Sequence, residues 1–118
     1  MARFTASKSK YRNKKCSYLG LSFDSQGERD RYIFLKDKQN QGIISELQNQ
    51  VRFDLCVNKQ KICLYIADFT YVKDNNLVVE DYKSTATAKL STFVLKKKLM
   101  KACHGIEIKL VKKPTDML

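Results

Sequence analysis

"ADFTYVKDNNLVVEDYKS", residues Ala67–Ser84, is the stretch that decides the fold, because it places two apolar segments on either side of a polar turn. Residues 61–72 are rich in β-branched and aromatic side chains, which is typical of a β-strand. Residues 74–76 (Asp-Asn-Asn) indicate a turn, since asparagine tolerates the left-handed backbone region. Residues 77–83 predict a second strand, so we expect an antiparallel hairpin.

Three charged side chains, Asp68, Asp81 and Lys83, interrupt the apolar pattern of this hairpin. If residues 75–76 form a two-residue turn, Asp68 faces Lys83 and Thr70 faces Asp81. All four side chains then share one face, because side chains alternate along a strand, and opposed Cβ atoms lie about 5 Å apart. We therefore predict that two carboxylates and one ammonium group converge. A one-residue register slip would separate them.

Two interpretations of these charges are open at this point. A cross-strand ion pair at a sheet edge would explain Asp68 and Lys83 and would contribute little to stability. This ion pair does not explain Asp81, which lies beside the same apolar residues. Two neighbouring carboxylates repel each other unless a cation joins them. Mg²⁺ prefers such oxygen ligands, and a bound metal suits hydrolysis of a phosphodiester. We therefore favour a metal site with Lys83 beside it.

The remaining patterns predict a single α/β domain at residues 16–118, with the element order α-β-β-β-α-β and a mixed central sheet flanked by helices. Its expected elements are a short strand or extended lead-in at 17–23, a helix at 25–42, one long bent strand or two short ones at 43–57, the hairpin, a helix at 85–105 and a strand at 106–111. Ser25 is the expected N-cap of the first helix, and Gly42 and Gly105 are the expected helix stops.

Glu28 is a third acid of interest. Its simplest role is to complete a capping box with Ser25. However, Tyr32 and Leu35 follow it at i+4 and i+7, which places Glu28 on the apolar face of the helix. We therefore expect Glu28 to point inward over the sheet, where it could supply a further metal ligand.

The chain of 118 residues has 23 Lys+Arg against 12 Asp+Glu, a net charge of +11. Such an excess makes nucleic acid the first candidate partner and an acidic membrane surface the second. No apolar run approaches the roughly 20 residues that span a bilayer, and no strongly amphipathic basic helix with Trp or Phe anchors stands out. We therefore favour nucleic acid as the partner, with no membrane and no small-molecule cofactor.

Residues 1–15 contain six basic residues and no acid, which predicts a flexible basic arm. Two interpretations of this arm are open. It is either a solvated tail or an arm that orders on phosphates, with Lys14 and Lys15 in contact with DNA.

The four cysteines (Cys16, Cys56, Cys63 and Cys103) form no CxxC pair. Without close ligand pairs or a signal peptide, neither zinc nor disulfides are expected. We predict reduced thiols, the last three in core or sheet positions.

The ordered segments "FDSQGERDRY", "VRFDL", "YIADFTYV", "VVEDYKS" and "LKKKLMKACHGIEI", within residues 21–110, resemble the PD-(D/E)XK nuclease superfamily. More narrowly, they are similar to a family of small proteins, mostly of phage origin, placed in that superfamily. The D-x-K tripeptide alone is common, whereas the ordered set is far more specific. The resemblance implies a restriction-endonuclease-like αβββαβ core and a place in the cytoplasm of a bacterial or phage-infected cell.

The resemblance also implies roles for individual residues. Asp68 would be the central metal ligand, and Asp81 would be the second acid, with the backbone carbonyl of Tyr82 as a further ligand. Lys83 would position or activate the attacking water, and Glu28 would be the acid of the first helix. The cofactor would be Mg²⁺, with Mn²⁺ as a substitute.

Two positions depart from the family pattern. Ala67 stands where many relatives have proline before the first aspartate. Glu80 adjoins Asp81, so either could take the acid position; alternation with Lys83 favours Asp81.

The predicted function is that of a Mg²⁺-dependent endodeoxyribonuclease, selective for junctions or branched DNA and active as a homodimer, because small members of the superfamily include dimeric Holliday-junction resolvases. Candidate DNA contacts besides the arm are Lys96, Lys97, Arg52 and Gln48; a solvated helix face is the alternative for the lysines of the second helix. One small domain leaves little room for base readout, so we expect recognition of shape or phosphates. The alternative function is a basic DNA-binding protein of the same fold that does not cleave, and a third is a ribonuclease.

Overall fold

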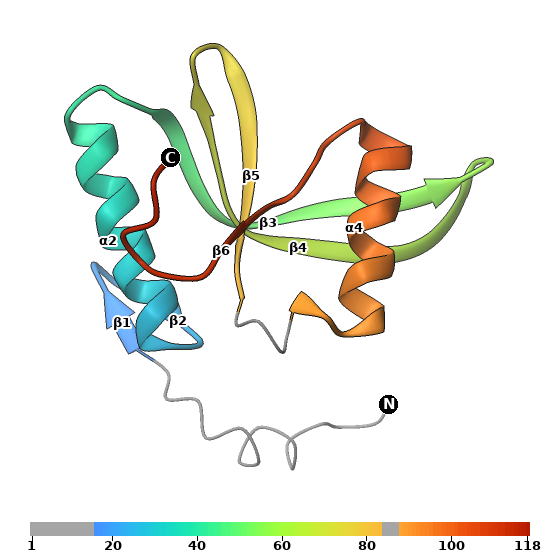
Figure 1. Ribbon diagram of the computed structural model, residues 1–118, viewed down its shortest axis with the longest axis horizontal. Coiled ribbons are helices and arrows are strands. Elements are labelled where there is room, and N and C mark those ends of the chain that lie inside the picture. Colours follow the sequence, from blue (N-terminus) through green and yellow to red (C-terminus); the bar gives the residue numbers. More distant parts are fainter. Residues whose placement is uncertain (1–15, 84–87) are drawn as a thin grey trace.

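The computed structural model describes residues 16–83 and 88–118. Its elements are β1 (Cys16–Tyr18), β2 (Leu21–Phe23), α2 (Gln26–Asn40), β3 (Ser45–Val57), β4 (Gln60–Lys73), β5 (Asn76–Tyr82), α4 (Ser91–His104) and β6 (Lys109–Val111) (Figure 1). The predicted basic arm at residues 1–15 lies outside the described residues. Within these ranges, no helix has both the length and the apolar character needed to cross a membrane.

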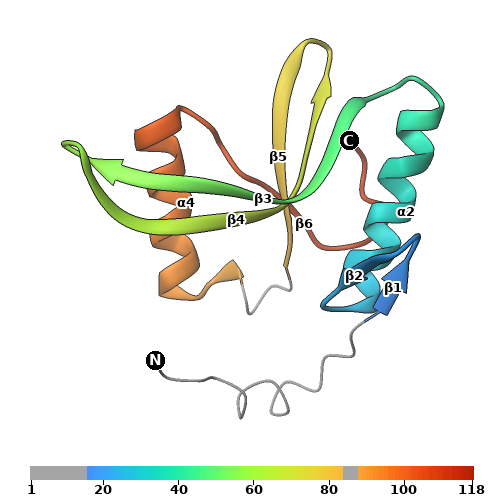
Figure 2. The same cartoon turned by 180° about the vertical axis from the view of Figure 1, so that it is seen from behind.

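A mixed four-stranded sheet forms the centre of the fold, with the strand order β3-β4-β5-β6. The β3–β4 and β4–β5 pairs are antiparallel and the β5–β6 pair is parallel, so the predicted mixed α/β sheet is confirmed. The segment expected to be one short strand before α2 is instead a small hairpin of β1 and β2. The β3–β4 hairpin extends under α4, whereas the β4–β5 hairpin projects in another direction and α2 lies on the opposite side (Figures 1 and 2).

Two separate hydrophobic clusters hold the helices onto the sheet, and β4 contributes to both. In the first cluster, Tyr65 and Ala67 of β4 are buried with Phe93 and Met100 of α4, among others. In the second, Phe69 and Tyr71 of β4 are buried with residues of α2, including Leu35. Asp68 therefore lies at the point where β4 passes from one core to the other.

The turn of the β4–β5 hairpin differs from the predicted one. Lys73 pairs with Asn76, so the two turn residues are Asp74 and Asn75, and not residues 75–76. Both have a positive φ, 53° and 65°, which is the backbone geometry of a type I′ hairpin turn. Aspartate tolerates this left-handed conformation much as asparagine does. Local preferences therefore could not distinguish a turn at residues 74–75 from the predicted turn at residues 75–76.

The corrected turn shifts the hairpin register by two residues. Thr70 pairs with Val79 and not with Asp81. Continuing this register beyond the last ladder pair places Asp68 opposite Asp81, and not opposite Lys83 as predicted. Because the shift is an even number of residues, it leaves the alternation of faces intact. The two aspartates still meet, and they meet more directly than the sequence indicated.

The second long helix is shorter than predicted. It was expected from residue 85, but α4 begins at Ser91, after Leu90 in an extended conformation; residues 84–87 lie outside the described ranges. The helix ends as predicted at Gly105, whose φ of 69° is left-handed and therefore favours glycine. The last strand is also shorter than the predicted 106–111 and pairs with β5 over only three residues.

Three cysteines have described side chains, and all three are free thiols, as predicted. Cys56 and Cys63 lie on β3 and β4, whereas Cys103 lies on α4 and is partly buried. Cys56 is exposed and so does not contribute to the core.

Candidate functional site

The Asp68 and Asp81 carboxylates form the centre of the candidate site, where the β4–β5 ladder ends. The backbone N–H of Tyr82 donates to Asp68 Oδ2 at 2.8 Å. In the other direction, the backbone N–H of Asp68 donates to Asp81 Oδ1 at 3.3 Å. Asp81 is 1% exposed. Each aspartate side chain thus accepts a hydrogen bond from a backbone N–H of the facing strand. These two hydrogen bonds hold the two predicted metal ligands against each other.

Lys83 and Tyr65 both lie beside Asp81. Lys83 Nζ is 3.6 Å from Asp81 Oδ2, and the Tyr65 hydroxyl donates to the same oxygen at 2.8 Å. The Lys83 side chain is 23% exposed and its Nζ lies 5.0 Å from the centroid of the Phe93 ring. Its backbone N–H donates to Val111 O. Lys83 is therefore held at the site by β6 and α4, with its ammonium group too far from Asp81 for a short hydrogen bond.

Glu28 points inward, as predicted from its helical spacing. Ser25 caps α2 by accepting the Glu28 backbone N–H at 3.1 Å, so the predicted N-cap is confirmed. The Glu28 side chain, however, does not complete the capping box: its Oε2 accepts a hydrogen bond from Gln50 Nε2 at 3.1 Å. Glu28 is 6% exposed. It therefore belongs to the buried polar region between α2 and β3.

Close packing of α2 against β5 brings Glu28 toward the aspartates. Gly27 lies directly before Glu28, and a Cβ atom there would lie only 2.7 Å from Tyr82 Cζ and nearer still to the Tyr82 hydroxyl. Real Cβ atoms essentially never approach a neighbour this closely. Glycine at this position therefore lets the first turn of α2 contact the strand that carries Asp81.

The carboxylates of the site influence one another's ionisation. Burial raises the pKa of Glu28 to about 7, with further increases from Asp24 and Asp81 and an opposing effect of Lys83. Burial also raises the pKa of Asp68 to about 9, again with contributions from Asp81 and Glu28. One ammonium group thus faces several buried acids. When all three acids are ionised, the site carries more negative charge than Lys83 alone can compensate.

These shifts predict that the metal-free protein loses stability as pH rises. The folded state binds protons more tightly than the unfolded state at Glu28 and Asp68, so their contribution is complete below pH about 4 and is lost as pH rises through about 7 and then about 9. For Glu28 alone, the loss between pH 4.5 and 7 is roughly 3 kcal/mol. Urea unfolding in EDTA at pH 5, 7 and 9 measures it. The Asp68→Asn variant should show a flatter profile, and a wild-type stability that rises over this range would contradict the assignment.

The donor set available to a metal is small. Asp68 Oδ1 and Glu28 Oε1 accept no hydrogen bond from residues 16–83 or 88–118, whereas both oxygens of Asp81 are engaged. Within those ranges, no group of three or more His, Cys, Asp and Glu side chains is arranged to hold a metal ion. The residues present offer the Asp68–Asp81 pair and the Tyr82 carbonyl as oxygen donors of the type Mg²⁺ prefers, with Glu28 behind them.

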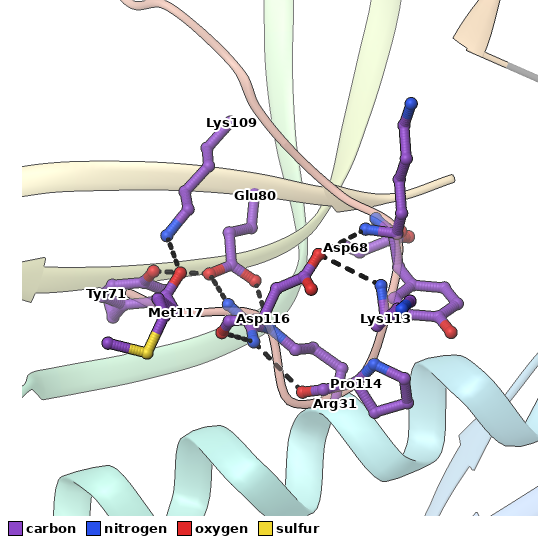
Figure 3. Close-up of polar contacts among 11 residues, drawn as sticks. Arg31, Asp68, Tyr71, Glu80, Lys109, Lys113, Pro114, Asp116 and Met117 are labelled. Carbon is purple, nitrogen blue, oxygen red and sulfur yellow. Dashed lines mark hydrogen bonds and ion pairs between the residues drawn. The ribbon is translucent and has the colours of Figure 1, made fainter. Parts of the chain in front are cut away.

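Glu80, the alternative acid, is committed elsewhere. Arg31 of α2 donates to both of its oxygens, from Nε at 2.9 Å and from Nη2 at 2.6 Å, and the Tyr71 hydroxyl also donates to it (Figure 3). Arg31 and Glu80 are both fully buried. Arg31 Nη1 additionally donates to the carbonyls of Pro114 and Asp116 in the C-terminal segment. Alternation along β5 favours Asp81 as the site acid, and the structure uses Glu80 to join α2 to the sheet.

A pocket of about 290 Å³ opens beside Asp81 and Lys83, and Lys96 is in its lining. Of the predicted DNA contacts, Lys96 therefore lies at the site. Lys97 lines a different pocket, with Lys101 and Glu107, away from the aspartates. Gln48 and Arg52 are exposed on β3, opposite Thr70 and Ile66 of β4. Lys14 and Lys15 lie outside the described residues.

Two site residues, Gln50 and Tyr65, were not predicted from the sequence. Gln50 stands between the two β3 residues that were named, Gln48 and Arg52, so its polarity and period-two spacing were available as a signal. Tyr65 has the pattern of a core residue and is buried as one. Only its hydroxyl hydrogen bond to Asp81 makes it part of the site, and no local pattern encodes that contact.

The fold and the site together define a small α/β protein with a mixed sheet and a pair of aspartates, one buried and one partly buried, at its centre. The chain belongs to the family described as "Protein of unknown function (DUF1064)", whose sequence profile matches residues 8–113. That range includes α2, the whole sheet, α4 and every residue of the candidate site. No curated protein and no solved structure matches the chain.

Proposed function

We propose that this protein is a metal-dependent endodeoxyribonuclease with a restriction-endonuclease-like fold and a PD-(D/E)XK site. The observation that carries the proposal is the contact between Asp68 and Asp81, with Lys83 Nζ 3.6 Å from Asp81 Oδ2. A structural ion pair needs one carboxylate and one ammonium group. Here a second carboxylate, the partly buried Asp68, stands beside that pair, and a third, Glu28, raises the pKa of Asp68 further.

The charge distribution of the chain supports this proposal at two scales. Locally, burial raises the pKa values of Glu28 and Asp68, repulsion from neighbouring carboxylates raises them further, and a divalent cation would offset both effects. Globally, a net charge of +11 favours a polyanionic partner over a small acidic substrate. An acidic centre in a basic protein therefore suits a reaction in which a cation and a phosphodiester meet.

In this proposal each residue has one role. Asp68, Asp81 and the Tyr82 carbonyl would hold Mg²⁺ or Mn²⁺, with Glu28 as an additional ligand. When bound, the metal stabilises charge on a phosphoryl oxygen and lowers the pKa of water. Lys83 orients the attacking water or stabilises negative charge as a point cation. Tyr65 holds Asp81 in place through its hydroxyl, since burial and Asp81 both raise the pKa of Tyr65 and keep it protonated.

We further propose that the substrate is recognised by its backbone and shape, as in branched or junction DNA, and that a homodimer is the active form. Lys96 lies in the pocket beside Asp81 and could contact a phosphate. A dimer would bring two sites to two strands. Light scattering during gel filtration tests the dimer, and a monomer that nicks a single strand would overturn that part of the proposal.

A cleavage assay tests the enzyme directly. Supercoiled plasmid, a synthetic four-way junction and single-stranded RNA are incubated with the protein in Mg²⁺, in Mn²⁺ and in EDTA. We expect metal-dependent nicking of DNA, faster on the junction, and none in EDTA. Tight binding of DNA without cleavage in any metal would instead identify a non-catalytic DNA-binding protein. Cleavage confined to RNA would identify a ribonuclease.

The Lys83→Ala variant is expected to reduce nicking by at least about 10²-fold, because it removes the group that acts on the water or the developing charge. DNA binding in EDTA should persist. The matched control is Lys61→Ala, which removes an exposed lysine at the far end of the β3–β4 hairpin and should leave the nicking rate unchanged. Equal rates for the two variants would exclude Lys83 from the reaction.

A further inference from the structure

Gln50 has an unusual backbone conformation within a strand. Its φ is 54°, a left-handed value that is uncommon for residues other than glycine. It lies within β3, between the pairs Asn49–Phe69 and Val51–Ala67, which keep the same register on both sides of it. Gln50 itself lies opposite Asp68. The ladder is therefore distorted at one residue, beside the candidate site.

Other left-handed residues in the described ranges have local explanations. Each of the following lies in a hairpin turn, where a positive φ is expected: Leu19, Asn58, Lys59, Asp74 and Asn75. Glu46 lies within the register shift between Ser45 and Gln48, which is typical of a bulge. Gln50 has neither a turn nor a register shift. Unusual backbone conformations of this kind collect at functional sites, where the surroundings maintain them.

The Gln50 side chain makes one specific contact, and it reaches the site. Its Nε2 donates to Glu28 Oε2 at 3.1 Å, which joins β3 to the first turn of α2. The carboxamide is neutral, so it fixes the orientation of the Glu28 carboxylate without pairing its charge as an arginine or lysine would. Glu28 Oε1 accepts no hydrogen bond from residues 16–83 or 88–118. The carboxylate is thus held by one oxygen while the other stays available.

We infer that Gln50 is a positioning residue that orients Glu28 for binding a divalent cation next to the Asp68–Asp81 pair, and that its left-handed backbone is maintained for this purpose. The inference rests on the proposed function, because it assigns Gln50 to the same metal site. It goes beyond that function by predicting that stability and activity oppose each other at this position. Relief of the backbone strain should stabilise the protein, whereas loss of the carboxamide should weaken the site.

The Gln50→Gly variant separates the two effects, because glycine adopts a positive φ without steric cost and lacks the carboxamide. We expect its melting temperature to equal or exceed that of the wild type. The affinity for Mn²⁺, measured by calorimetry, and kcat for nicking should each fall about 10- to 100-fold, the usual effect of losing a group that orients a ligand. KM for DNA should stay unchanged. The Gln50→Asn variant, which tolerates the same backbone but is one methylene shorter, should not restore Mn²⁺ affinity.

Glu46→Gly is the matched control, since Glu46 is an exposed residue of the same strand with a similar φ of 55°. It should keep wild-type Mn²⁺ affinity and kcat. If Gln50→Gly behaves like Glu46→Gly in both measurements, the inference is overturned.

A readout independent of activity keeps this inference distinct from the proposed nuclease. The side-chain amide signals of Gln50, observed by NMR in the metal-free protein, should shift in Glu28→Gln and stay in place in Glu46→Gln. Absence of that shift would overturn the inference even in an active nuclease. A shift together with weakened Mn²⁺ binding in Gln50→Gly would support it even if no DNA substrate is cleaved, in which case only the proposed nuclease fails.

Discussion

Replacement of Asp81 by asparagine is expected to lower the rate of metal-dependent nicking by at least about 10²–10³-fold. Asp81 is the carboxylate that contacts Asp68, Tyr65 and Lys83 together. The substitution keeps the shape of the side chain but removes the negative charge that a cation requires. Rates on supercoiled plasmid in Mg²⁺ and Mn²⁺ measure the effect.

The same substitution should leave the fold intact, which separates loss of chemistry from loss of structure. Asparagine can still bond Tyr65 or the Asp68 N–H, and the change also removes the repulsion between Asp81 and its acidic neighbours. We therefore expect the free energy of unfolding at pH 8 in EDTA to change by less than about 1 kcal/mol. Asp74→Asn, in the exposed turn, is the matched control and should cleave normally. A cleaving Asp81→Asn protein would remove Asp81 from the site.

Replacement of Arg31 by methionine is expected to lower the free energy of unfolding by about 3–5 kcal/mol, because it leaves the buried charge of Glu80 without its partner. Both side chains are 0% exposed, and Arg31 also bonds two carbonyls of the C-terminal segment (Figure 3). Urea unfolding monitored by circular dichroism measures the loss. A decrease of less than about 1 kcal/mol would show that this ion pair does not hold the fold.

Two controls identify the cause of the Arg31 effect. The double variant Arg31→Met, Glu80→Leu removes both charges and should recover part of the lost stability, since an uncompensated buried charge is the main penalty. The exposed pair Lys61–Asp54, whose side chains are 56% and 63% exposed, makes a single contact of 3.3 Å and is the comparison at the surface. Lys61→Met should cost no more than about 1 kcal/mol.

The Arg31–Glu80 pair also explains how α2 is placed relative to the site. Arg31 lies one helical turn after Glu28, and Glu80 is the residue before Asp81. The bidentate ion pair therefore sets the distance between the helix acid and the strand acid, and Gly27 permits the close approach beside it. Variants that weaken this pair should disturb the site even though neither residue belongs to it.

Local sequence signals predicted most of the elements, and they predicted that Asp68 and Asp81 share one face of the hairpin. The hairpin, the Ser25 cap and the Gly42 and Gly105 stops follow from conformational preferences of a few neighbouring residues. Period-two alternation also separated Asp81 from Glu80, because adjacent strand residues point to opposite faces. The turn was the exception, since Asp-Asn and Asn-Asn suit a left-handed turn almost equally, and neighbouring residues alone could not choose between them.

The sequence by itself therefore determined an α/β chain with paired acids on a hairpin and an excess of positive charge. Only the tertiary structure decided which atoms meet: Asp68 with Asp81, Tyr65 with Asp81, and Gln50 with Glu28. These contacts join residues on different strands and on α2, across two hydrophobic cores. Their geometry depends on how the helices pack on a bent sheet, whereas a sequence pattern records only the preferences of residues that are close along the chain.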